Sequence, residues 1–394
     1  MMSTGTRSAT CQFTQPRDIR MGGGALGQIG SVVTALHVRR PLVVTDRFIV
    51  STGVAERVIG LLEKAGLQPR LFAETVPDPT TASLDAGVAA AKEYGSDAVI
   101  GLGGGSPLDT AKAIALLAVQ GGQMADYKAP RQNTGPALPI IAIPTTAGSG
   151  SEATQFTIIT DSASDEKMLC PGRSFLPVAA IVDYELTLTM PPRLTADTGI
   201  DALTHAVEAY VSRKSNPLSD SLCLAAIATI GRYLHRAYAD GADREARSAM
   251  TTAATQAGIA FSNSSVALVH GMSRPIGAHF HVAHGLSNAM LFPAVTAYSV
   301  DAATPRYADC SRAFGFAGAG SDDRSAARAL VEGLTQLGAD LAVPTPHSYG
   351  IGEADWTRLI PTMAEQALAS GSPGNNPLVP SADDIAELYV RTYR

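Results

Sequence analysis

The chain has 394 residues, of which 45% are hydrophobic and 17% are charged, and its formal net charge is -6. At roughly 150 residues per domain, this length predicts two or three packed units with a substantial core. The absence of runs of like charge argues against nucleic-acid and membrane-surface partners, and the longest apolar stretches, such as 113–119, are far shorter than the ~20 residues that span a bilayer. We therefore expect the partners to be small molecules or further copies of the chain.

Cysteine usage and the N-terminal residues bear on the cellular compartment. The four cysteines, Cys11, Cys170, Cys223 and Cys310, are far apart and form no CxxC pair. This spacing is typical of reduced thiols rather than of a disulfide framework or a thiolate zinc site. Arg7 is followed by polar residues and not by an apolar segment, so we expect no secretory signal. A cytoplasmic protein is predicted, in which any metal is held by other residue types.

The first half of the chain alternates short β-branched segments with helical segments. We predict strands at 41–45, 70–72, 98–102, 139–143 and 179–182, with helices around 54–65 and 84–94. This βαβα order predicts an α/β unit built on a mostly parallel sheet with helices on both faces.

After a Met-Pro-Pro step at 190–192, strand signals nearly disappear and Ala-rich, helix-favouring sequence continues to the last residue. We predict a boundary near Arg193, with an α/β domain over 1–193 and an all-α domain over 194–394. Ligand pockets favour domain interfaces and the carboxyl ends of parallel strands. The cleft between the two halves is therefore the expected site.

The predicted strand at 98–102 is followed by three consecutive glycines, Gly103, Gly104 and Gly105. We expect Ser106 to be the N-cap of the next helix, Pro107 its first residue, and Asp109 an acceptor for its first N–H groups. The glycines let the backbone approach a ligand, and the free N–H groups of a helix start favour a phosphate. The loop is neither a GxGxxG motif nor a Walker loop, so a glycine-rich turn without a ligand is the alternative.

A second polar loop, PTTAGSGSEAT, follows the next predicted strand, and in it Thr145, Thr146 and Ser149 offer hydroxyls at the same sheet edge. Two such loops favour a cofactor pyrophosphate over a pair of ordinary turns. Asp46 ends the first predicted strand, where a carboxylate accepts hydrogen bonds from an adenosine ribose and repels a 2′-phosphate, which favours NAD over NADP. An aspartate that caps the next helix is equally consistent with the sequence.

Histidines are unevenly distributed, since four of the eight fall within fifteen residues that begin at His270 and end at His284. His205 follows Asp201 by four residues in a predicted helix, so both lie on one face. Such a pair alone is more often a local helix contact than a metal site. With His270 and His284 it provides three imidazoles and one carboxylate, a set suited to Fe(II), Zn(II), Mn(II), Co(II) or Ni(II). The alternating AHFHV segment adds two less favoured candidates.

Four segments, GGGSPLDTAKA, PTTAGSGSEAT, TADTGIDALTHAVEAYVS and VHGMSRPIGAHFHVAHGLSNAMLFP, together resemble the iron-containing (group III) alcohol dehydrogenases. The resemblance covers nearly the whole chain. It implies a Rossmann-like N-terminal dinucleotide domain and a helical C-terminal domain, the dehydroquinate synthase-like fold. It also implies reversible oxidation of an alcohol to an aldehyde with NAD(P) and a divalent metal, usually iron. A homodimer or a higher homo-oligomer is implied by the family alone.

The resemblance assigns roles to individual residues. It implies that the metal ligands are Asp201, His205, His270 and His284. The cofactor contacts that it implies are Asp46, Gly103, Gly104, Gly105, Ser106, Thr145, Thr146 and Lys167. Ser149 is a further candidate from the second polar loop itself. The chain departs from the family at Asp78, where many members have Asn, and at Arg274, where many have a histidine proposed to assist proton transfer.

A divalent cation lowers the pKa of a bound hydroxyl and polarises a carbonyl, while the nicotinamide accepts or donates the hydride. We expect a chain of water or ribose hydroxyls to carry the proton, with His281 near its mouth. Arg274 cannot replace a histidine in this role, because a guanidinium does not lose its proton near neutral pH. We expect Arg274 to bind an anionic group of the substrate, such as a carboxylate. An arginine paired with a helix carboxylate outside the pocket is the alternative.

Three other interpretations are considered. Two are enzymes on the same scaffold, a dehydroquinate-synthase-like lyase and a maleylacetate reductase, and the full set of one Asp and three His argues against both. The third is a noncatalytic NAD-binding protein, which a test of turnover separates from a dehydrogenase.

Overall fold

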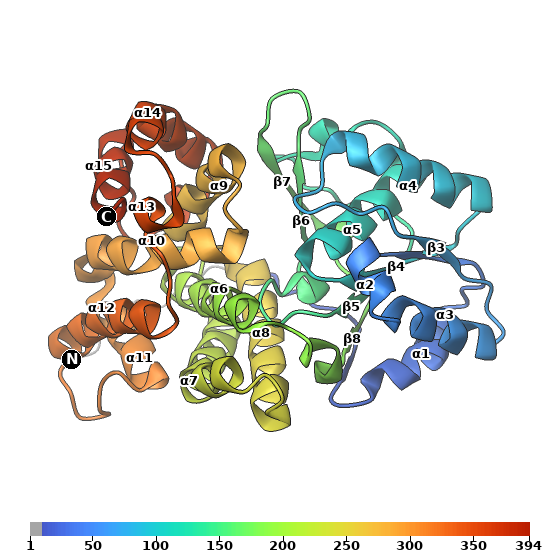
Figure 1. Ribbon diagram of the computed structural model, residues 1–394, viewed down its shortest axis with the longest axis horizontal. Coiled ribbons are helices and arrows are strands. Elements are labelled where there is room, and N and C mark those ends of the chain that lie inside the picture. Colours follow the sequence, from blue (N-terminus) through green and yellow to red (C-terminus); the bar gives the residue numbers. More distant parts are fainter. Residues whose placement is uncertain (1–9) are drawn as a thin grey trace.

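The computed structural model describes residues 10–394, so Arg7, on which the expectation of no secretory signal rests, lies outside the described residues. An α/β half and an all-helical half lie side by side (Figure 1). The α/β half contains a six-stranded parallel sheet in the order β1-β8-β5-β4-β2-β3 and a separate antiparallel pair, β6-β7. The strands are β1 (Asp18–Met21), β2 (Pro41–Val44), β3 (Arg70–Phe72), β4 (Ala98–Gly103), β5 (Ile140–Pro144), β6 (Phe156–Thr160), β7 (Lys167–Pro171) and β8 (Ala179–Val182).

All five predicted strands form, as β2, β3, β4, β5 and β8, with ends within one residue of the expected ones. Three strands were not predicted. β1 has four residues and pairs with β8 alone, at the edge of the sheet. β6 and β7 form a hairpin outside the parallel sheet, so the βαβα pattern gave no sign of them.

Successive residues of β2 face opposite layers of the α/β half. Leu42 and Val44 join a buried cluster with residues of α4 and α5, whereas Val43 joins one with residues of α1 and α3. Because side chains alternate along a strand, a sheet covered on both faces requires apolar residues at every position. The helices of this half are α1 (Ile29–Ala35), α2 (Arg47–Ser51), α3 (Val54–Lys64), α4 (Thr81–Tyr94) and α5 (Gly105–Gln120).

The second half is helical, as predicted. Its helices are α6 (Pro192–Val211), α7 (Pro217–Ala239), α8 (Arg244–Ser264), α9 (Leu268–Phe280), α10 (His284–Ser299), α11 (Thr304–Phe314), α12 (Asp323–Asp340), α13 (Pro346–Tyr349), α14 (Glu353–Ala369) and α15 (Ala382–Thr392). The last strand of the sheet ends at Val182 and α6 begins at Pro192, which is compatible with the boundary predicted near Arg193. Among residues 10–394, no helix combines the length and apolar character needed to cross a bilayer.

The start of α5 differs from the prediction. The helix begins at Gly105 with Gly104 as its N-cap, and no side chain caps it. Ser106 instead accepts a hydrogen bond from the backbone N–H of Asp78, and Asp109 accepts one from the N–H of Ile158. The expected caps were wrong because tertiary partners take up both side chains. The first N–H groups of α5 are thus left for another acceptor.

Candidate metal and cofactor site

Two of the predicted metal ligands lie on α6, which is buried over most of its length. Asp201 and His205 are one turn apart on this helix, and each is 4% exposed. Burial lowers the pKa of His205, and a contact from the backbone of Gly148, in the second polar loop, opposes this shift. The loop therefore contacts a predicted metal ligand directly.

The other two predicted ligands lie near the starts of α9 and α10. His270 is the third residue of α9 and is 3% exposed, and His284 is the first residue of α10, with 41% of its side chain exposed. Glu208 of α6 caps the start of α9 from outside, since its carboxylate accepts hydrogen bonds from the N–H groups of Ala267 and Val269 at 2.9 and 2.6 Å. The same carboxylate accepts a hydrogen bond from Nδ1 of His270 at 2.7 Å.

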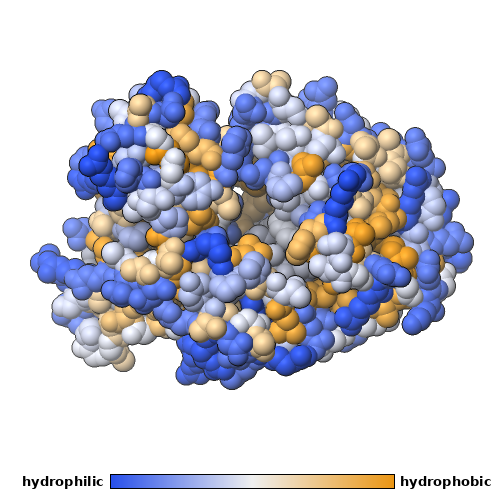
Figure 2. All heavy atoms as spheres, in the orientation of Figure 1, coloured by the Kyte–Doolittle hydropathy of each residue, from blue (hydrophilic) through white to orange (hydrophobic). Residues whose placement is uncertain are grey.

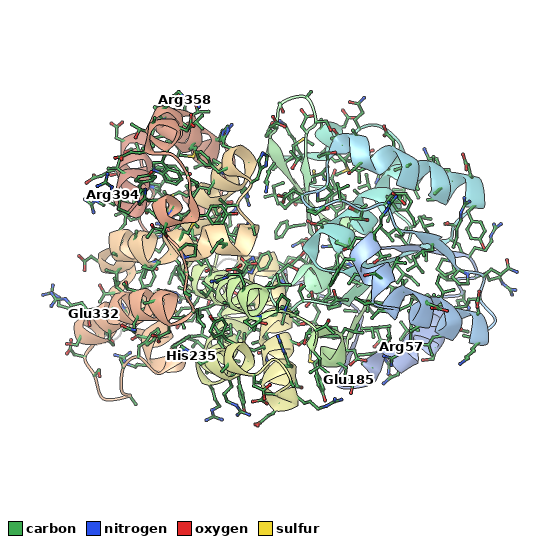
Figure 3. The ribbon with its side chains drawn as sticks, in the orientation of Figure 1. Arg57, Glu185, His235, Glu332, Arg358 and Arg394 are labelled. Carbon is green, nitrogen blue, oxygen red and sulfur yellow. The ribbon has the colours of Figure 1, made fainter. Side chains whose placement is uncertain are left out.

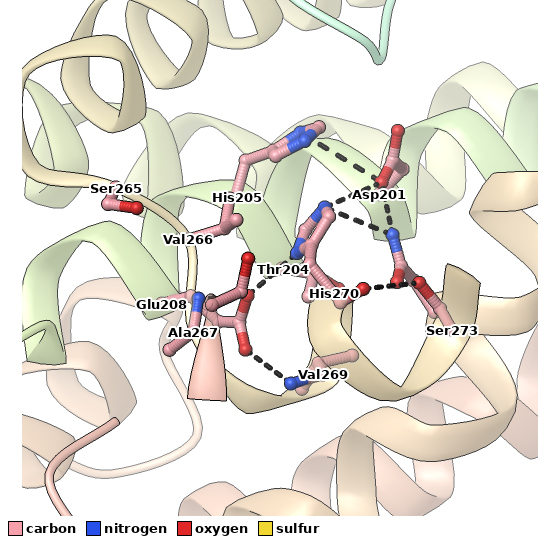
Figure 4. Close-up of polar contacts among 12 residues, drawn as sticks. Asp201, Thr204, His205, Glu208, Ser265, Val266, Ala267, Val269, His270 and Ser273 are labelled. Atoms are coloured by element: carbon pink, nitrogen blue, oxygen red, sulfur yellow. Dashed lines mark hydrogen bonds and ion pairs between the residues drawn. The ribbon is translucent and has the colours of Figure 1, made fainter. Parts of the chain in front are cut away.

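The four predicted ligands converge, and each offers one ligand atom within 4.8 Å of all the others. Asp201 Oδ1 lies 3.9 Å from His205 Nδ1 and 3.6 Å from His270 Nε2 (Figure 4). The same oxygen lies 3.8 Å from His284 Nε2. The rings of His205 and His270 stack with centroids 4.4 Å apart. Atoms at these separations are able to share one ion.

Three of the four predicted ligands have pKa values that favour metal ligation. Burial alone would raise the pKa of Asp201, but the imidazoles of His205, His284 and His270 outweigh it and hold that pKa well below its usual value. Burial lowers the pKa of His205 to about 3 and that of His284 to about 4. Burial alone would lower the pKa of His270, but hydrogen bonds to Asp201 and Glu208 raise it. Metal ligands must be deprotonated, so Asp201, His205 and His284 meet this condition. At His270 a metal would have to compete with a proton.

The cluster contains buried polar atoms that have no partner. Nδ1 of His205 and Oδ1 of Asn288 are buried and make no hydrogen bond. The amide nitrogen of Asn288 lies 2.7 Å from Asp201 Oδ1, 3.1 Å from His270 Nε2 and 3.3 Å from His284 Nε2. A buried nitrogen lone pair without a donor is costly, and a cation among the four side chains would remove that cost. The residues present therefore fit a divalent metal.

A cavity of about 190 Å³ joins the cluster to the loops at the sheet edge. A hollow between the two halves is visible in Figure 2. All four residues of the cluster line this cavity. Of the predicted cofactor contacts, those that line it are Gly105, Ser106, Ser149 and Lys167.

The other predicted cofactor contacts do not line the cavity. Gly103 adopts φ +145°, and a Cβ there would lie 2.6 Å from Pro107, so the turn itself requires glycine. A Cβ on Gly104 would meet Thr146 at an ordinary 3.4 Å, so packing within the protein does not exclude a side chain there. The N–H of Thr145 donates to the carbonyl of Gly103 at 3.0 Å and joins the two loops.

Asp46 is the N-cap of α2, since its Oδ1 accepts a hydrogen bond from the N–H of Ile49 at 2.8 Å. The capping alternative that the sequence left open is therefore present. β2 and β4 are neighbours whose connections leave in opposite directions, and such a switch point is where dinucleotides bind in open parallel sheets. Contact of Asp46 with a ribose remains a prediction.

Lys167 lies on β7 and is paired with Asp78, with Nζ 2.9 Å from Oδ1. The Lys167 side chain is 8% exposed, whereas that of Asp78 is 54% exposed. Both residues line the cavity, and Asp78 also donates its N–H to Ser106 at 3.3 Å. This ion pair connects the β6-β7 hairpin to the glycine loop.

Arg274 lines the cavity, one turn after His270 on α9, and no carboxylate lies within ion-pair distance of it among the described residues. The alternative of a salt bridge outside the pocket is therefore wrong. His279, the first histidine of AHFHV, makes a hydrogen bond with Gln366 at 2.9 Å and lies outside the cluster. His281 is exposed at the end of α9 and does not line the cavity, so its role in proton relay stays a prediction.

Sequence reasoning missed Glu208 and Asn288, although both are close to predicted ligands in sequence. Glu208 is three residues after His205, and Asn288 is four residues after His284. Helical spacing places each on the same face as its ligand, so this spacing was the available signal.

Two family models match nearly the whole chain. The model described as "Iron-containing alcohol dehydrogenase" matches residues 16–184, and the one described as "Fe-containing alcohol dehydrogenase family, C-terminal" matches residues 195–393. An NAD-dependent methanol dehydrogenase of Bacillus methanolicus is 37% identical over 95% of this chain and 98% of its own length. A long-chain-alcohol dehydrogenase 1 of Geobacillus thermodenitrificans is 41% identical over 95% of this chain and 94% of its own.

A solved structure agrees with these relatives. The crystal structure of a 1,3-propanediol oxidoreductase superposes with a TM-score of 0.93 and 31% sequence identity. The match covers 98% of this chain and 100% of the other.

Proposed function

This chain belongs to the iron-containing alcohol dehydrogenase family, and we propose that Asp201, His205, His270 and His284 hold its catalytic divalent metal. Family membership makes the chain an NAD-dependent, metal-dependent oxidoreductase of alcohols and aldehydes. The observation that carries the site proposal is the convergence of four ligand atoms within 4.8 Å. The buried, unpartnered Nδ1 of His205 supports it.

We propose Fe(II) as the resident metal, with Zn(II) as the alternative. One carboxylate and three imidazoles suit either ion, and no thiolate is present to favour zinc. The description of the family supports iron.

We propose that the cofactor lies between the two polar loops, with its pyrophosphate at the uncapped start of α5. This placement is supported by the free N–H groups there and by Gly104 and Gly105, which keep the backbone open to a ligand. Asp46 follows β2, and Asp78, which is paired with Lys167, follows β3, the neighbouring strand of the sheet. An acidic residue at the end of β2 favours NAD, and NADP is the alternative.

The chain's own residues orient the reaction. A hydride moves from the carbinol carbon of the alcohol to the nicotinamide ring, and the hydroxyl proton leaves to solvent as the carbonyl forms; the reverse reaction takes up both. A divalent metal, when bound, supplies Lewis acidity that lowers the pKa of the hydroxyl and polarises the carbonyl. Glu208 holds the ring of His270 by its Nδ1–H, so that the lone pair of Nε2 faces Asp201 and the other predicted ligands. Phe156, Phe261 and other apolar side chains of the cavity exclude water from the reacting carbon.

We propose a cytoplasmic location and a homodimeric or higher assembly. Cysteines without disulfide partners support the first. The second rests on the family alone and is tested by light scattering on the purified protein.

The direct test is absorbance at 340 nm with NAD and a panel of primary alcohols and aldehydes, on protein reconstituted with Fe(II). Turnover with one bound metal per chain is expected. Absence of turnover in metal-loaded protein would favour a noncatalytic NAD-binding protein instead.

A further inference from the structure

Arg274 is a charged residue in the wall of the cavity that the four predicted metal ligands also line. It follows His270 by four residues on α9, so its Cα lies about 6 Å farther along the helix axis on the same face. It lines the same cavity as the four predicted ligands. Its charge therefore acts on the part of the cavity where a substrate meets the metal.

Within residues 10–394, the guanidinium has no anionic partner. One of its terminal nitrogens donates a hydrogen bond to the hydroxyl of Ser372 at 3.1 Å. Glu208 is the carboxylate whose charge acts on it, but that carboxylate is already taken by two backbone N–H groups and His270. Arginine carries five N–H donors, so most of them are left for a partner from outside the chain.

The other basic side chain that lines the cavity, Lys167, does have an anionic partner. Lys167 is paired with Asp78 at 2.9 Å. Burial lowers the pKa of Arg274 to about 10, which keeps the guanidinium charged at neutral pH. A desolvated cation without a counter-ion is unfavourable, and an anion in the cavity would compensate it.

Packing holds the Arg274 side chain in position. Ser372 is 3% exposed and directly precedes a 3-10 turn, Pro373–Asn375. A Cβ on Gly271 would lie 2.7 Å from Pro373, so α9 and this turn are in close contact. The contact fixes Ser372 beside Arg274. Ser372 is therefore a positioning residue.

We propose that Arg274 binds a carboxylate or sulfonate at the end of the substrate remote from the reacting carbon. This inference rests on the proposed function and names the substrate class, short hydroxy acids and oxo acids rather than simple alcohols. A planar guanidinium donates two parallel hydrogen bonds to such a group. The position on α9 argues against a cofactor phosphate, because the uncapped helix start that would bind it lies at Gly105, across the cavity.

The test compares ω-oxo acids of two to five carbons with unsubstituted aldehydes of the same length, using NADH and iron-loaded enzyme. A matching series of ω-sulfonated aldehydes distinguishes sulfonate from carboxylate. In the unmodified enzyme we expect kcat/KM to be at least about tenfold higher for the anionic member of the best pair. Losing a charge-assisted hydrogen-bond pair is expected to lower this ratio about tenfold in Arg274→Gln, to near one, chiefly through KM. Arg274→Lys should retain a larger ratio than Arg274→Gln, because lysine keeps the positive charge but cannot donate two parallel hydrogen bonds.

Two variants control the comparison. Ser372→Ala keeps the charge of Arg274 but removes the hydroxyl that holds its side chain in position. We expect this variant to lower the ratio of kcat/KM values about threefold. Arg358→Gln removes an exposed arginine from α14, distant from the cavity (Figure 3), and leaves the ratio unchanged.

Binding provides a second measurement that does not depend on turnover. Succinic semialdehyde, but not butanal, should raise the midpoint of thermal unfolding of the unmodified enzyme, and Arg274→Gln should abolish the difference. An equal ratio in unmodified enzyme and Arg274→Gln, with both retaining metal and aldehyde reduction, overturns the anion site and leaves the proposed function standing. A metal-loaded enzyme that reduces neither aldehydes nor oxo acids overturns both.

Discussion

Two buried polar clusters lie on either side of the cavity, and they differ in completeness. In the α/β half, Lys112 of α5 is 0% exposed, and its Nζ lies within 2.7 to 3.1 Å of four oxygens, from Ser151, Thr154 and Phe156. Asp109 nearby accepts hydrogen bonds from Ser151 and from the backbone. In the helical half, the four predicted metal ligands direct lone pairs toward one another.

The number of polar atoms without a partner distinguishes a cluster that stabilises the fold from one that is suited to bind a ligand. Buried polar groups are stable when each has a partner, and Lys112 has its partners within the chain. The cluster around Asp201 has the amide of Asn288 as a donor, and Nδ1 of His205 has none. The first cluster therefore stabilises the loops at the sheet edge, whereas the second has the features of a cation site.

The largest effect is expected from His270→Ala, which removes one ligand. We expect loss of bound metal and a fall in kcat/KM of at least about 1000-fold, because the Lewis acid leaves with it. The variant stays folded, since α9 remains capped by Glu208. Metal analysis and circular dichroism check both parts, with His235→Ala on the outer face of α7 as the control (Figure 3). Normal metal content with normal turnover would refute the ligand assignment.

The complementary change is Lys112→Met in the other cluster. Removing one partner of a buried charged network is expected to cost about 3 to 5 kcal/mol of unfolding free energy. Metal content should stay near that of the unmodified protein, because Lys112 touches none of the ligands. Urea unfolding and metal analysis on the same sample test this contrast, and loss of metal without loss of stability would contradict it.

A smaller effect is expected from Glu208→Gln, which leaves all four ligands in place. The amide accepts a hydrogen bond from His270 more weakly than the carboxylate does, so metal affinity should fall about 10-fold to 100-fold. Competition with a chelator measures this affinity. The control is Glu332→Gln on the outer face of α12 (Figure 3), and equal affinities in the two variants would exclude the positioning role of Glu208.

The smallest effect is expected at Asp46. Asp46→Ala removes the cap of α2 and should cost about 1 kcal/mol, whereas Asp46→Asn keeps an acceptor and most of this stability. If Asp46 also contacts the ribose, Asp46→Asn should raise the preference for NADP about tenfold. Unchanged preference in Asp46→Asn would leave Asp46 with its capping role alone.

The sheet was predictable because its signals are local. Each predicted strand is a short apolar run next to a turn, and burial on both faces made those runs continuous. Strand β1 gave no such signal, because half of its residues are exposed. The wrong caps at Ser106 and Asp109 show the limit of local reasoning, since partners distant in sequence decided both.

The site was predictable to the extent that its residues share a motif. Asp201 and His205 are neighbours on one helix, whereas their approach to His270 and His284 depends on how three helices pack. The four-residue spacing between His270 and Arg274 indicated that both lie on one face of α9. The lack of an ion-pair partner for Arg274 depends on tertiary packing. No pattern in the sequence reveals an absent contact.

The most direct test of the account is the location of the bound metal by anomalous scattering from crystals of iron-loaded protein, with data on both sides of the iron absorption edge. The account predicts one strong peak per chain, enclosed by the side chains of Asp201, His205, His270 and His284. A peak elsewhere, or ordered iron-loaded crystals without any peak among these four side chains, would contradict it.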